Sequence, residues 1–361
     1  MLADAGSIPA ASTISPRQSG RGSDPSIGIA GTGAYIMIWR QMDTRATARR
    51  PDPPHVTFVV PAFNEAETLP SLLDRIARAA AAAGVPFDTL VVDDGSRDAT
   101  PRVVRDAPAA CRARLLRLSR NFGKEAALTA GLDHAEGDVV LCLDSDGQHP
   151  PELLPRMLEL WRSGHEMIYG VRADRGAEPF FKRAGSRTFY ALMRAGSGIE
   201  IPENAGDFRL MDRCVVTALR ALPERHRFMK GIFAWVGFDS VGLSYTPEER
   251  QGGKTHYSRR QLTSLALAGV TSFTALPLRL AMIVGTLLAL VAMGYGTYLI
   301  VEDWVYGHDV PGWPTVVVSI MFLSGLQLLF IGIVGEYLAR VFEEVKARPT
   351  YILAEDHKPD A

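Results

Sequence analysis

The sequence of 361 residues lacks the features that mark several large classes of protein. It has three cysteines and no Cys-x-x-Cys pair, which argues against a disulfide framework and a structural zinc site. Its 39 Lys and Arg residues are balanced by 40 Asp and Glu residues, so no bulk positive charge is available to bind nucleic acid. Because 47% of the residues are hydrophobic, disorder throughout is excluded. We expect one large folded domain with additions, or two domains.

Charge is also absent from two long stretches near the C-terminus. Residues 280–301 and 310–335 contain no charged side chain. At about 1.5 Å per helical residue, each stretch covers the roughly 30 Å hydrocarbon core of a bilayer. The alternative is a pair of buried core helices, but soluble core helices rarely run this long without a charge. We predict transmembrane helices at 277–301 and 310–336, joined by a short loop at 302–309.

The flanking charges predict the orientation of this hairpin. The loop has no Lys or Arg, whereas basic residues lie on the outer side of both helices: Arg259, Arg260, Arg279, Arg340, Lys346 and Arg348. By the positive-inside rule, the loop lies outside the cell and both termini are cytoplasmic, in a multi-pass protein of the inner membrane. Segment 258–276 is expected to be a helix at the membrane surface, with packing on the soluble body as the alternative. Residues 337–361 are expected to form a cytoplasmic helix and tail.

The first 50 residues show no helix or strand periodicity. They are rich in Gly, Ser, Ala and Arg, and they lack the basic start and apolar centre of a signal peptide. We expect this tail to be disordered or to precede the true start of the protein, for which Met42 is a candidate.

The body between residues 51 and 257 alternates strand and helix patterns. Apolar runs predict strands at 55–60, 89–92, 114–118 and 138–143, with helices at 67–83 and 124–135. This alternation predicts an α/β domain with a mostly parallel sheet. Ligands of such sheets bind beyond the carboxyl ends of the strands.

Oxygen-bearing side chains follow three of the predicted strands. They lie in the segments 61–65 (PAFNE), 93–96 (DDGS) and 144–150 (DSDGQHP). Any one segment can be explained as a turn or helix cap, but capping explains all three together poorly. No GxGxxG or GxxxxGK[ST] loop follows these strands, so phosphates would not be held by a glycine loop.

The segment 144–150 is a candidate metal site. Asp144 and Asp146 lie two residues apart, so both can reach one ion from an extended segment, and Gln148 adds an amide oxygen. Hard oxygen ligands favour Mg²⁺ or Mn²⁺. An Asp-x-Asp pair on its own is also typical of a turn.

The order and spacing of these motifs resemble those of family-2 inverting glycosyltransferases with a GT-A fold. The resemblance is carried by residues 61–65, 93–96, Thr100, 120–124 and 144–150. Later segments resemble the polyprenyl-phosphate glycosyltransferases, which include dolichol-phosphate mannosyltransferases and the bactoprenol glucosyltransferases with a two-helix C-terminal hairpin: residues 170–172, 206–210, 335–338 and 348–351. The resemblance covers about residues 56–351. The QxxRW motif of processive polysaccharide synthases is absent.

The resemblance implies a metal-dependent enzyme that moves a sugar from a UDP- or GDP-linked donor to a polyprenyl phosphate, such as undecaprenyl phosphate, on the cytoplasmic leaflet. Two alternatives are a related enzyme with another lipid or glycan acceptor, and a non-catalytic membrane scaffold with a decayed transferase domain. The intact motifs count against the scaffold. Since hairpin-anchored relatives include tetramers, a homo-oligomer is expected.

The resemblance also implies roles for individual residues. Asp207 is the expected catalytic carboxylate with Arg209 beside it, although a helix cap or a partner for Arg209 would also explain this aspartate. The metal is expected on Asp144, Asp146 and Gln148. The acceptor phosphate is expected at Arg259 and Arg260, for which a solvated helix end is the alternative. The nucleotide sugar is expected to contact Pro61, Phe63, Asn64, Glu65, Asp93, Asp94, Lys124, Asp144, Ser145, Arg172, Arg250, Lys254 and His256.

One segment departs from the family pattern. Where the family has a lysine in its Gly-x-Ser-Lys-Tyr pattern, this chain has His256, and Lys254 lies two residues earlier. Which of the two meets the donor phosphates is therefore left open.

Overall fold

The computed structural model describes residues 50–173, 205–225, 227–246, 276–306 and 312–358. The expected N-terminal tail, nearly all of the expected membrane-surface helix at 258–276, and residues 307–309 of the expected loop lie outside these ranges.

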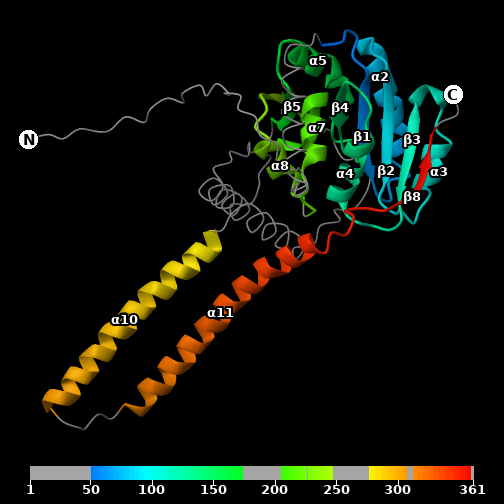
Figure 1. Ribbon diagram of the computed structural model, residues 1–361. Coiled ribbons are helices and arrows are strands. Elements are labelled where there is room, and N and C mark those ends of the chain that lie inside the picture. The colour runs from blue at the N-terminus through cyan, green and yellow to red at the C-terminus, as the bar shows by residue number, and fades with distance from the viewer. Residues whose placement is uncertain (1–49, 174–204, 226, 247–275, 307–311, 359–361) are drawn as a thin grey trace, which may run out of the picture.

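The centre of the fold is an eight-stranded sheet with the order β7-β5-β6-β4-β1-β2-β3-β8 (Figure 1). Strands β4, β1, β2 and β3 are parallel neighbours, as the alternating pattern predicts. Strand β6 is antiparallel to β4 and β5, and β8 is antiparallel to β3. The strands are β1 (Val56–Ala62), β2 (Phe87–Asp93), β3 (Ala113–Leu118), β4 (Val139–Cys142), β5 (Met167–Arg172), β6 (Ala205–Asp212), β7 (Ser240–Tyr245) and β8 (Leu353–His357).

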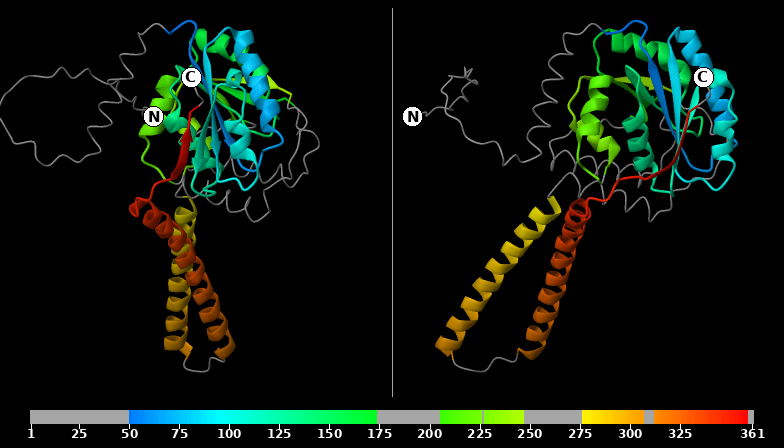
Figure 2. Two further views of the ribbon diagram at one scale, coloured as in Figure 1. Left: turned by 90° about the vertical axis from the view of Figure 1, so that its right-hand side faces the viewer. Right: turned by 45° about the vertical axis from the view of Figure 1, so that its right-hand side comes forward.

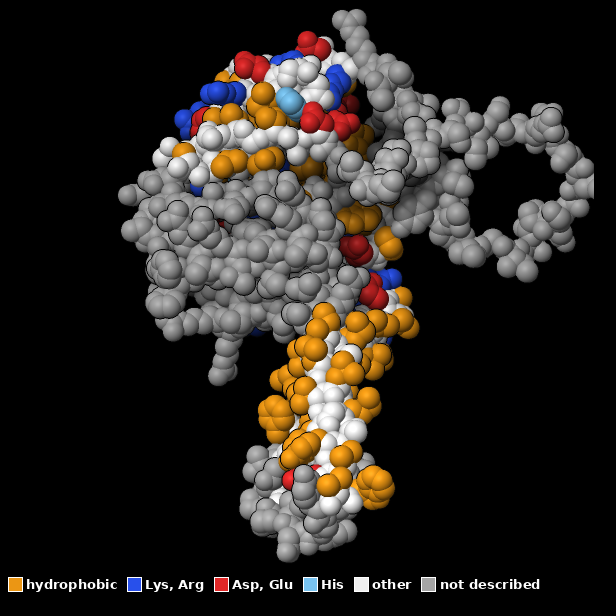
Figure 3. Space-filling model, turned by 90° about the vertical axis from the view of Figure 1, so that its left-hand side faces the viewer, with side chains coloured by type: hydrophobic (Ala, Val, Ile, Leu, Met, Phe, Trp, Pro, Cys, Tyr) orange, Lys and Arg blue, Asp and Glu red, His pale blue; other side chains and the backbone are white. Residues whose placement is uncertain are grey.

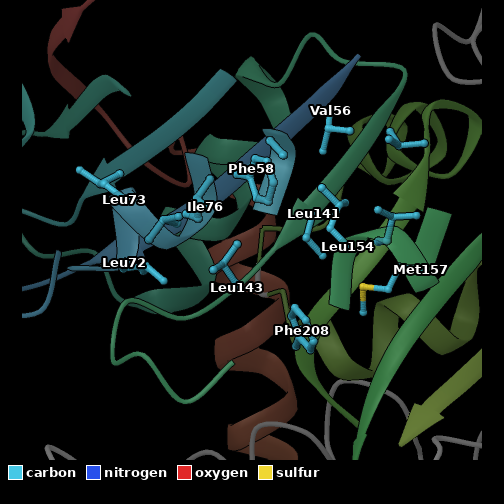
Figure 4. Packing of buried hydrophobic residues seen from close by; sticks show 14 of the residues in the cluster. Val56, Phe58, Leu72, Leu73, Ile76, Leu141, Leu143, Leu154, Met157 and Phe208 are labelled. Atoms are coloured by element: carbon cyan, nitrogen blue, oxygen red, sulfur yellow. The ribbon is translucent and has the colours of Figure 1, made fainter. Parts of the chain in front are cut away.

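Helices cover both faces of this sheet. Because side chains of a strand alternate between faces, Phe58 of β1 packs with α2 and α5, whereas Val59 packs with α4, α7 and α8. The first of these clusters, which includes Phe58, Leu141 and Phe208, is shown in Figure 4. The helices are α2 (Leu69–Ala83), α3 (Thr100–Arg105), α4 (Lys124–His134), α5 (Leu154–Arg162), α7 (Arg213–Ala221) and α8 (Met229–Trp235).

Two long helices, α10 (Leu276–Tyr306) and α11 (Trp313–Val345), extend away from the sheet domain (Figures 1 and 2). Each contains a stretch long and apolar enough to cross a membrane, Ala281–Tyr298 and Ser319–Val345, and neither stretch is buried in the structure. Their hydrophobic side chains form an apolar surface along the hairpin (Figure 3). This exposure is the opposite of what two soluble core helices would show.

The chain returns from the hairpin to the sheet. Residues 337–361 were expected to form a helix and tail. Helix α11 continues to Val345, and the residues that follow it include β8, which pairs with β3 at the sheet edge. Two bidentate ion pairs fasten this short strand: Arg105 with Glu355 and Arg114 with Asp356. The segment that follows α11 is therefore joined to the sheet by backbone pairing as well as by the covalent chain.

Candidate active site

The expected site lies at one edge of the sheet because four strand ends meet there. Strands β1, β2 and β4 are parallel neighbours, so their carboxyl ends lie together. Strand β6 runs the other way, and its Arg209 is in register with Cys142 at the end of β4. Asp207 therefore reaches the same edge as Asp144 from the opposite direction.

The Asp-x-Asp segment is a tight turn held from several sides. The Asp144 backbone N–H donates to Nδ1 of His149 at 3.0 Å, and the Gln148 N–H donates to Oδ1 of Asp146 at 3.1 Å. From outside the turn, Arg75 donates to the Gly147 carbonyl at 3.4 Å, and Arg172 donates to Oε1 of Gln148 at 3.3 Å. These contacts fix the backbone that carries both carboxylates.

His149 anchors this turn in the core. Its ring stacks on Phe208 with centroids 5.1 Å apart, and it is 1% exposed. Burial lowers the pKa of His149. Since Nδ1 accepts the Asp144 N–H, the 3.9 Å approach of Asp144 Oδ2 to that nitrogen is not a hydrogen bond. His149 is thus a neutral structural group, which the sequence motif alone did not identify.

Lys124 connects the two carboxylates that come from opposite strand directions. Its Nζ lies 2.6 Å from Oδ1 of Asp144 and 2.6 Å from Oδ2 of Asp207. Burial raises the pKa of Asp207, but Lys124, Lys230 and Arg209 more than offset this and lower it to about 2. Burial likewise lowers the pKa of Lys124, yet the two carboxylates bring it well above its ordinary value. Lys124 and Asp207 therefore form an ion pair at neutral pH, and the same ammonium contacts Asp144.

Arg209 lies inside the protein, behind Asp207. It is 2% exposed, with its guanidinium carbon 4.5 Å from the Phe233 ring centroid and 5.5 Å from that of Tyr169. Burial lowers the pKa of Arg209 to about 10, against the opposing influence of Asp207. One of its terminal nitrogens has no hydrogen-bond partner among the described residues. Arg209 can support the charge of Asp207 but offers almost no surface to a ligand.

The segment after β1 is joined to the turn after β2. The Asn64 N–H donates to Oγ of Ser96, while Asn64 Oδ1 accepts from the Arg97 N–H. Asn64 has φ 56°, a left-handed conformation that asparagine tolerates better than most residues. The Glu65 carboxylate accepts from Oγ1 of Thr68 at 2.8 Å. Pro61 is buried in β1, whereas Phe63 and Glu65 are half-buried beside Asn64.

The two acidic residues after β2 have partners within the protein. Asp93 accepts from the Ser96 N–H at 3.1 Å and pairs with Arg117 at 3.2 Å. Both oxygens of Asp94 accept backbone N–H groups, from Phe122 at 2.7 Å and Gly123 at 2.9 Å. Burial raises the pKa of Asp93 and of Asp94, with these hydrogen bonds opposing it. Asp94 therefore holds the loop that leads into Lys124, a role that the strand-end motif did not reveal.

Two further charged residues near Asp207 were not identified from the sequence. Glu125 follows Lys124 in the first turn of α4, and its Oε2 accepts from the Met229 N–H at 3.2 Å. Lys230 follows Met229 in α8, and its charge acts on both Asp207 and Glu125. Glu125 and Lys230 are far apart in the sequence and meet only through the contact between α4 and α8. No local sequence pattern therefore points to either residue.

Glu125 makes stability depend on pH in a predictable direction. Burial and the charge of Asp207 raise the pKa of Glu125 to about 7. Between pH 4.5 and 7 the folded protein binds more protons at this site than the unfolded chain, so the free energy of unfolding falls as pH rises. Relative to that of the wild type, the free energy of unfolding of Glu125→Gln should rise by on the order of 2 kcal/mol between pH 5 and pH 8. Thermal unfolding of the detergent-solubilised protein measures this, with Glu159→Gln on the exposed face of α5 as control. A constant difference across this range would contradict the assignment.

The metal-ligand candidates fit a site that is completed by a substrate. Among the described residues, no group of three His, Cys, Asp or Glu side chains is arranged to hold a metal ion. Asp144, Asp146 and Gln148 offer two carboxylates and an amide oxygen on one turn. Mg²⁺ is commonly bound by one or two carboxylates together with substrate phosphates. This donor set therefore suits a metal–diphosphate complex better than a metal alone.

Ser145 is buried within the turn, and Arg172 lies at its rim. The remaining expected binding residues lie outside the described part of the chain: Arg250, Lys254, His256, Arg259 and Arg260.

Comparison with known proteins identifies the family. Residues 57–219 match the model of glycosyl transferase family 2, and residues 276–341 match the GtrB C-terminal hairpin. The SfII prophage-derived bactoprenol glucosyl transferase of Shigella flexneri is 41% identical over 305 residues, covering 84% of this chain and 98% of the relative. An uncharacterized glycosyltransferase of Synechocystis is 40% identical over 301 residues, covering 83% and 95%.

Among solved structures, glucosyl-3-phosphoglycerate synthase from Mycobacterium tuberculosis is similar at 20% identity with a TM-score of 0.45, covering 65% of this chain and 80% of that one. The sheet order, the strand-end motifs and the hairpin agree with the two family matches. The chain belongs to glycosyl transferase family 2, with a GT-A fold and the GtrB type of C-terminal hairpin, alongside the bactoprenol glucosyl transferases.

Proposed function

We propose that this glycosyltransferase moves a sugar from a nucleotide sugar to a polyprenyl phosphate at the cytoplasmic face of the inner membrane. The observation that carries the proposal is the meeting of Asp144, Asp146 and Asp207 at one sheet edge, in a chain that also carries two long apolar helices. The bactoprenol glucosyl transferases, at 41% identity, support a polyprenyl phosphate as the acceptor.

The donor side has to neutralise a leaving nucleoside diphosphate. Asp144, Asp146 and Gln148 would hold Mg²⁺ or Mn²⁺, which supplies positive charge to the diphosphate as the bond to the sugar breaks. Arg172, which already contacts Gln148, adds a fixed guanidinium at the rim of the same turn. The residues 61–65 and the turn after β2 would bind the nucleoside.

The acceptor needs little activation. A phosphate monoester has a second pKa near 6, so it is largely a dianion at pH 7. A phosphate oxygen attacks the anomeric carbon, the bond from that carbon to the donor diphosphate breaks, and the nucleoside diphosphate leaves. In-line attack from the opposite face inverts the anomeric centre. Asp207, held ionised by Lys124, would orient the sugar or the acceptor rather than abstract a proton.

The acceptor phosphate also needs a cation on its own side of the site. Arg209 is buried, and Lys124 is held by two carboxylates. Lys230 is half-buried, and its charge reaches Asp207 from α8. Among the described residues we therefore assign Lys230 to the acceptor phosphate, beside Arg259 and Arg260, which are expected there from the sequence.

Lys230→Met is expected to raise the KM for a short-chain polyprenyl phosphate at least about tenfold, equivalent to about 1.4 kcal/mol of lost binding. Donor affinity, measured by calorimetry, stays unchanged because the donor ligands lie on the 144–150 turn. Lys230→Arg keeps the positive charge and restores much of the affinity. Loss of donor affinity with an unchanged acceptor KM would place Lys230 on the nucleotide side instead.

The hairpin would hold the site against the lipid. With a loop that lacks Lys and Arg, we propose an extracytoplasmic turn and a cytoplasmic sheet domain. A cysteine introduced at His308 should react with a membrane-impermeant maleimide in spheroplasts, whereas one introduced at Lys346 should react only after permeabilisation. Native Cys111 and Cys142 are buried, and Cys214, which is half-buried, is replaced by alanine in both variants to keep the background low. The reverse labelling pattern would invert the proposed topology.

The proposed reaction is tested by incubating membranes that contain the protein with labelled nucleotide sugars and Mg²⁺. Label is expected in a lipid that releases free sugar on mild acid, because a glycosyl phosphate is acid-labile. Label in an acid-stable lipid or a glycan would instead indicate another acceptor. Absence of transfer from every UDP- and GDP-sugar would contradict the enzyme assignment.

A further inference from the structure

Lys124 occupies a position that its neighbours fix before any ligand binds. Asp94 accepts hydrogen bonds from the N–H groups of Phe122 and Gly123, the two residues before Lys124. Helix α4 begins at Lys124 itself. The side chain then reaches both Asp144 and Asp207 at 2.6 Å. The lysine therefore stands between a metal-ligand candidate and the expected catalytic carboxylate.

This position brings Lys124 into competition with a metal ion. Asp144 Oδ1 already accepts the charged ammonium, and a divalent cation on the same carboxylate would be repelled by that charge at close range. Asp207 offers Lys124 a second anchor, so the ammonium need not enter water when it leaves Asp144. The site thus contains both a cation that competes with the metal for Asp144 and a second carboxylate, Asp207, that can hold this cation.

We propose that Lys124 is an internal counter-cation that occupies Asp144 when the donor is absent and yields it to the metal–diphosphate complex. The inference rests on the proposed function, because it assumes that Asp144 and Asp146 bind a metal with the donor. Two carboxylates held partly by a lysine bind a divalent ion weakly, whereas the donor diphosphate adds the negative charge that favours the exchange. Metal binding therefore depends on the nucleotide, and after the exchange Lys124 pairs with Asp207 alone.

The exchange links the two halves of the site. Before donor binding, Lys124 divides its charge between Asp144 and Asp207. After donor binding, its whole charge is directed at Asp207, which stabilises the ionised carboxylate just when the sugar is in place. Lys124 is accordingly a positioning residue for Asp207 as well as a barrier to unproductive metal binding.

The test measures Mn²⁺ binding to the full-length, detergent-solubilised protein by electron paramagnetic resonance, without nucleotide and with UDP or GDP. The wild type should bind Mn²⁺ weakly alone and at least about tenfold more tightly with one of the nucleotides, a gain of about 1.4 kcal/mol. Lys124→Met should raise the nucleotide-free affinity by a similar factor and so reduce the nucleotide-dependent gain. Lys124→Arg should retain the wild-type pattern. Lys230→Met, which removes a nearby charge that makes no ion pair with Asp144 among the described residues, should change nucleotide-free binding much less.

A second variant protects the test against misfolding. Lys124→Met leaves Asp207 buried without its cation, which is costly, whereas Lys124→Met combined with Asp207→Asn removes both charges together. Mn²⁺ should also bind this double variant more tightly without nucleotide. Unchanged or weaker nucleotide-free binding in both variants would overturn the exchange. If the wild type binds no Mn²⁺ even with nucleotide, or if Asp146→Asn does not affect that binding, the proposed metal-dependent function itself fails.

Discussion

Replacing Asp146 with asparagine is expected to lower the rate of sugar transfer by at least about 10³-fold while the protein stays folded. The Asp146 side chain is 9% exposed and comes from a turn that other contacts hold in place. Its Oδ1 accepts the Gln148 N–H, and an asparagine oxygen can accept the same hydrogen bond. The variant thus keeps this hydrogen bond and removes the negative charge that a metal–diphosphate complex would require.

The measurement is steady-state transfer with Mg²⁺ and with Mn²⁺, beside thermal unfolding followed by circular dichroism. Asp106→Asn is the matched control, because Asp106 is an exposed carboxylate at the end of α3, away from the 144–150 turn. Near-normal turnover of the Asp146 variant would exclude this residue from metal binding. Loss of the folded signal would assign it a structural role instead.

Asp207→Asn is expected to lower the turnover number by about 10²-fold or more, since under the proposed function it removes a carboxylate that acts on the sugar or the acceptor. Its side chain is 13% exposed and one of its oxygens is buried without a hydrogen-bond partner among the described residues. Because its pKa is lowered to about 2, Asp207 stays ionised across the working pH range, so its loss removes a permanent charge. Donor affinity measured without a metal ion is expected to stay within a few-fold of the wild type, because the residues expected to bind the nucleoside lie at the ends of β1 and β2.

Turnover and acceptor KM, measured beside calorimetric donor affinity, separate this role from a structural one. A fall in turnover with intact donor binding supports action on the sugar or acceptor. If the variant lost donor affinity and kept its turnover at saturating donor, Asp207 would belong to the donor site. Glu125→Gln provides a comparison, because Glu125 lies next to Lys124 and bonds to α8 rather than to Lys124's carboxylate partners.

The parts of the fold that repeat a local pattern were predictable from the sequence. Strand β1 is a continuous apolar run because both of its faces are buried, and α4 begins at Lys124, as the sequence predicts. Strand β8 was not predicted, because two of the five residues in its sequence LAEDH are acidic. It is held as a strand by pairing with β3 and by the ion pairs of Arg105 and Arg114. Tertiary contacts, rather than local preference, make that element.

The candidate site shows the same division. Strand-end position predicted that Asp144 and Asp94 would lie near one edge, and the structure places them there. Strand-end position did not reveal that both oxygens of Asp94 accept backbone N–H groups, or that Arg209 lies between the rings of Tyr169 and Phe233. Whether a polar side chain serves a ligand or the protein depends on neighbours that are distant in sequence. The contact of Lys124 with two aspartates, 20 and 83 positions away, is of this kind.

The most direct test of the central claim compares three acceptors in otherwise identical vesicles: a polyprenyl phosphate, the same polyprenol without phosphate, and a diacylglycerol. Purified protein is supplied with Mg²⁺ and the nucleotide sugar that gives transfer in membranes, and the lipid product is identified by mass spectrometry. The account predicts a polyprenyl phosphate sugar with inverted anomeric configuration, formed by the wild type and not by Asp146→Asn. Equal transfer to the polyprenol or the diacylglycerol, or a product that the Asp146 variant also forms, would contradict it.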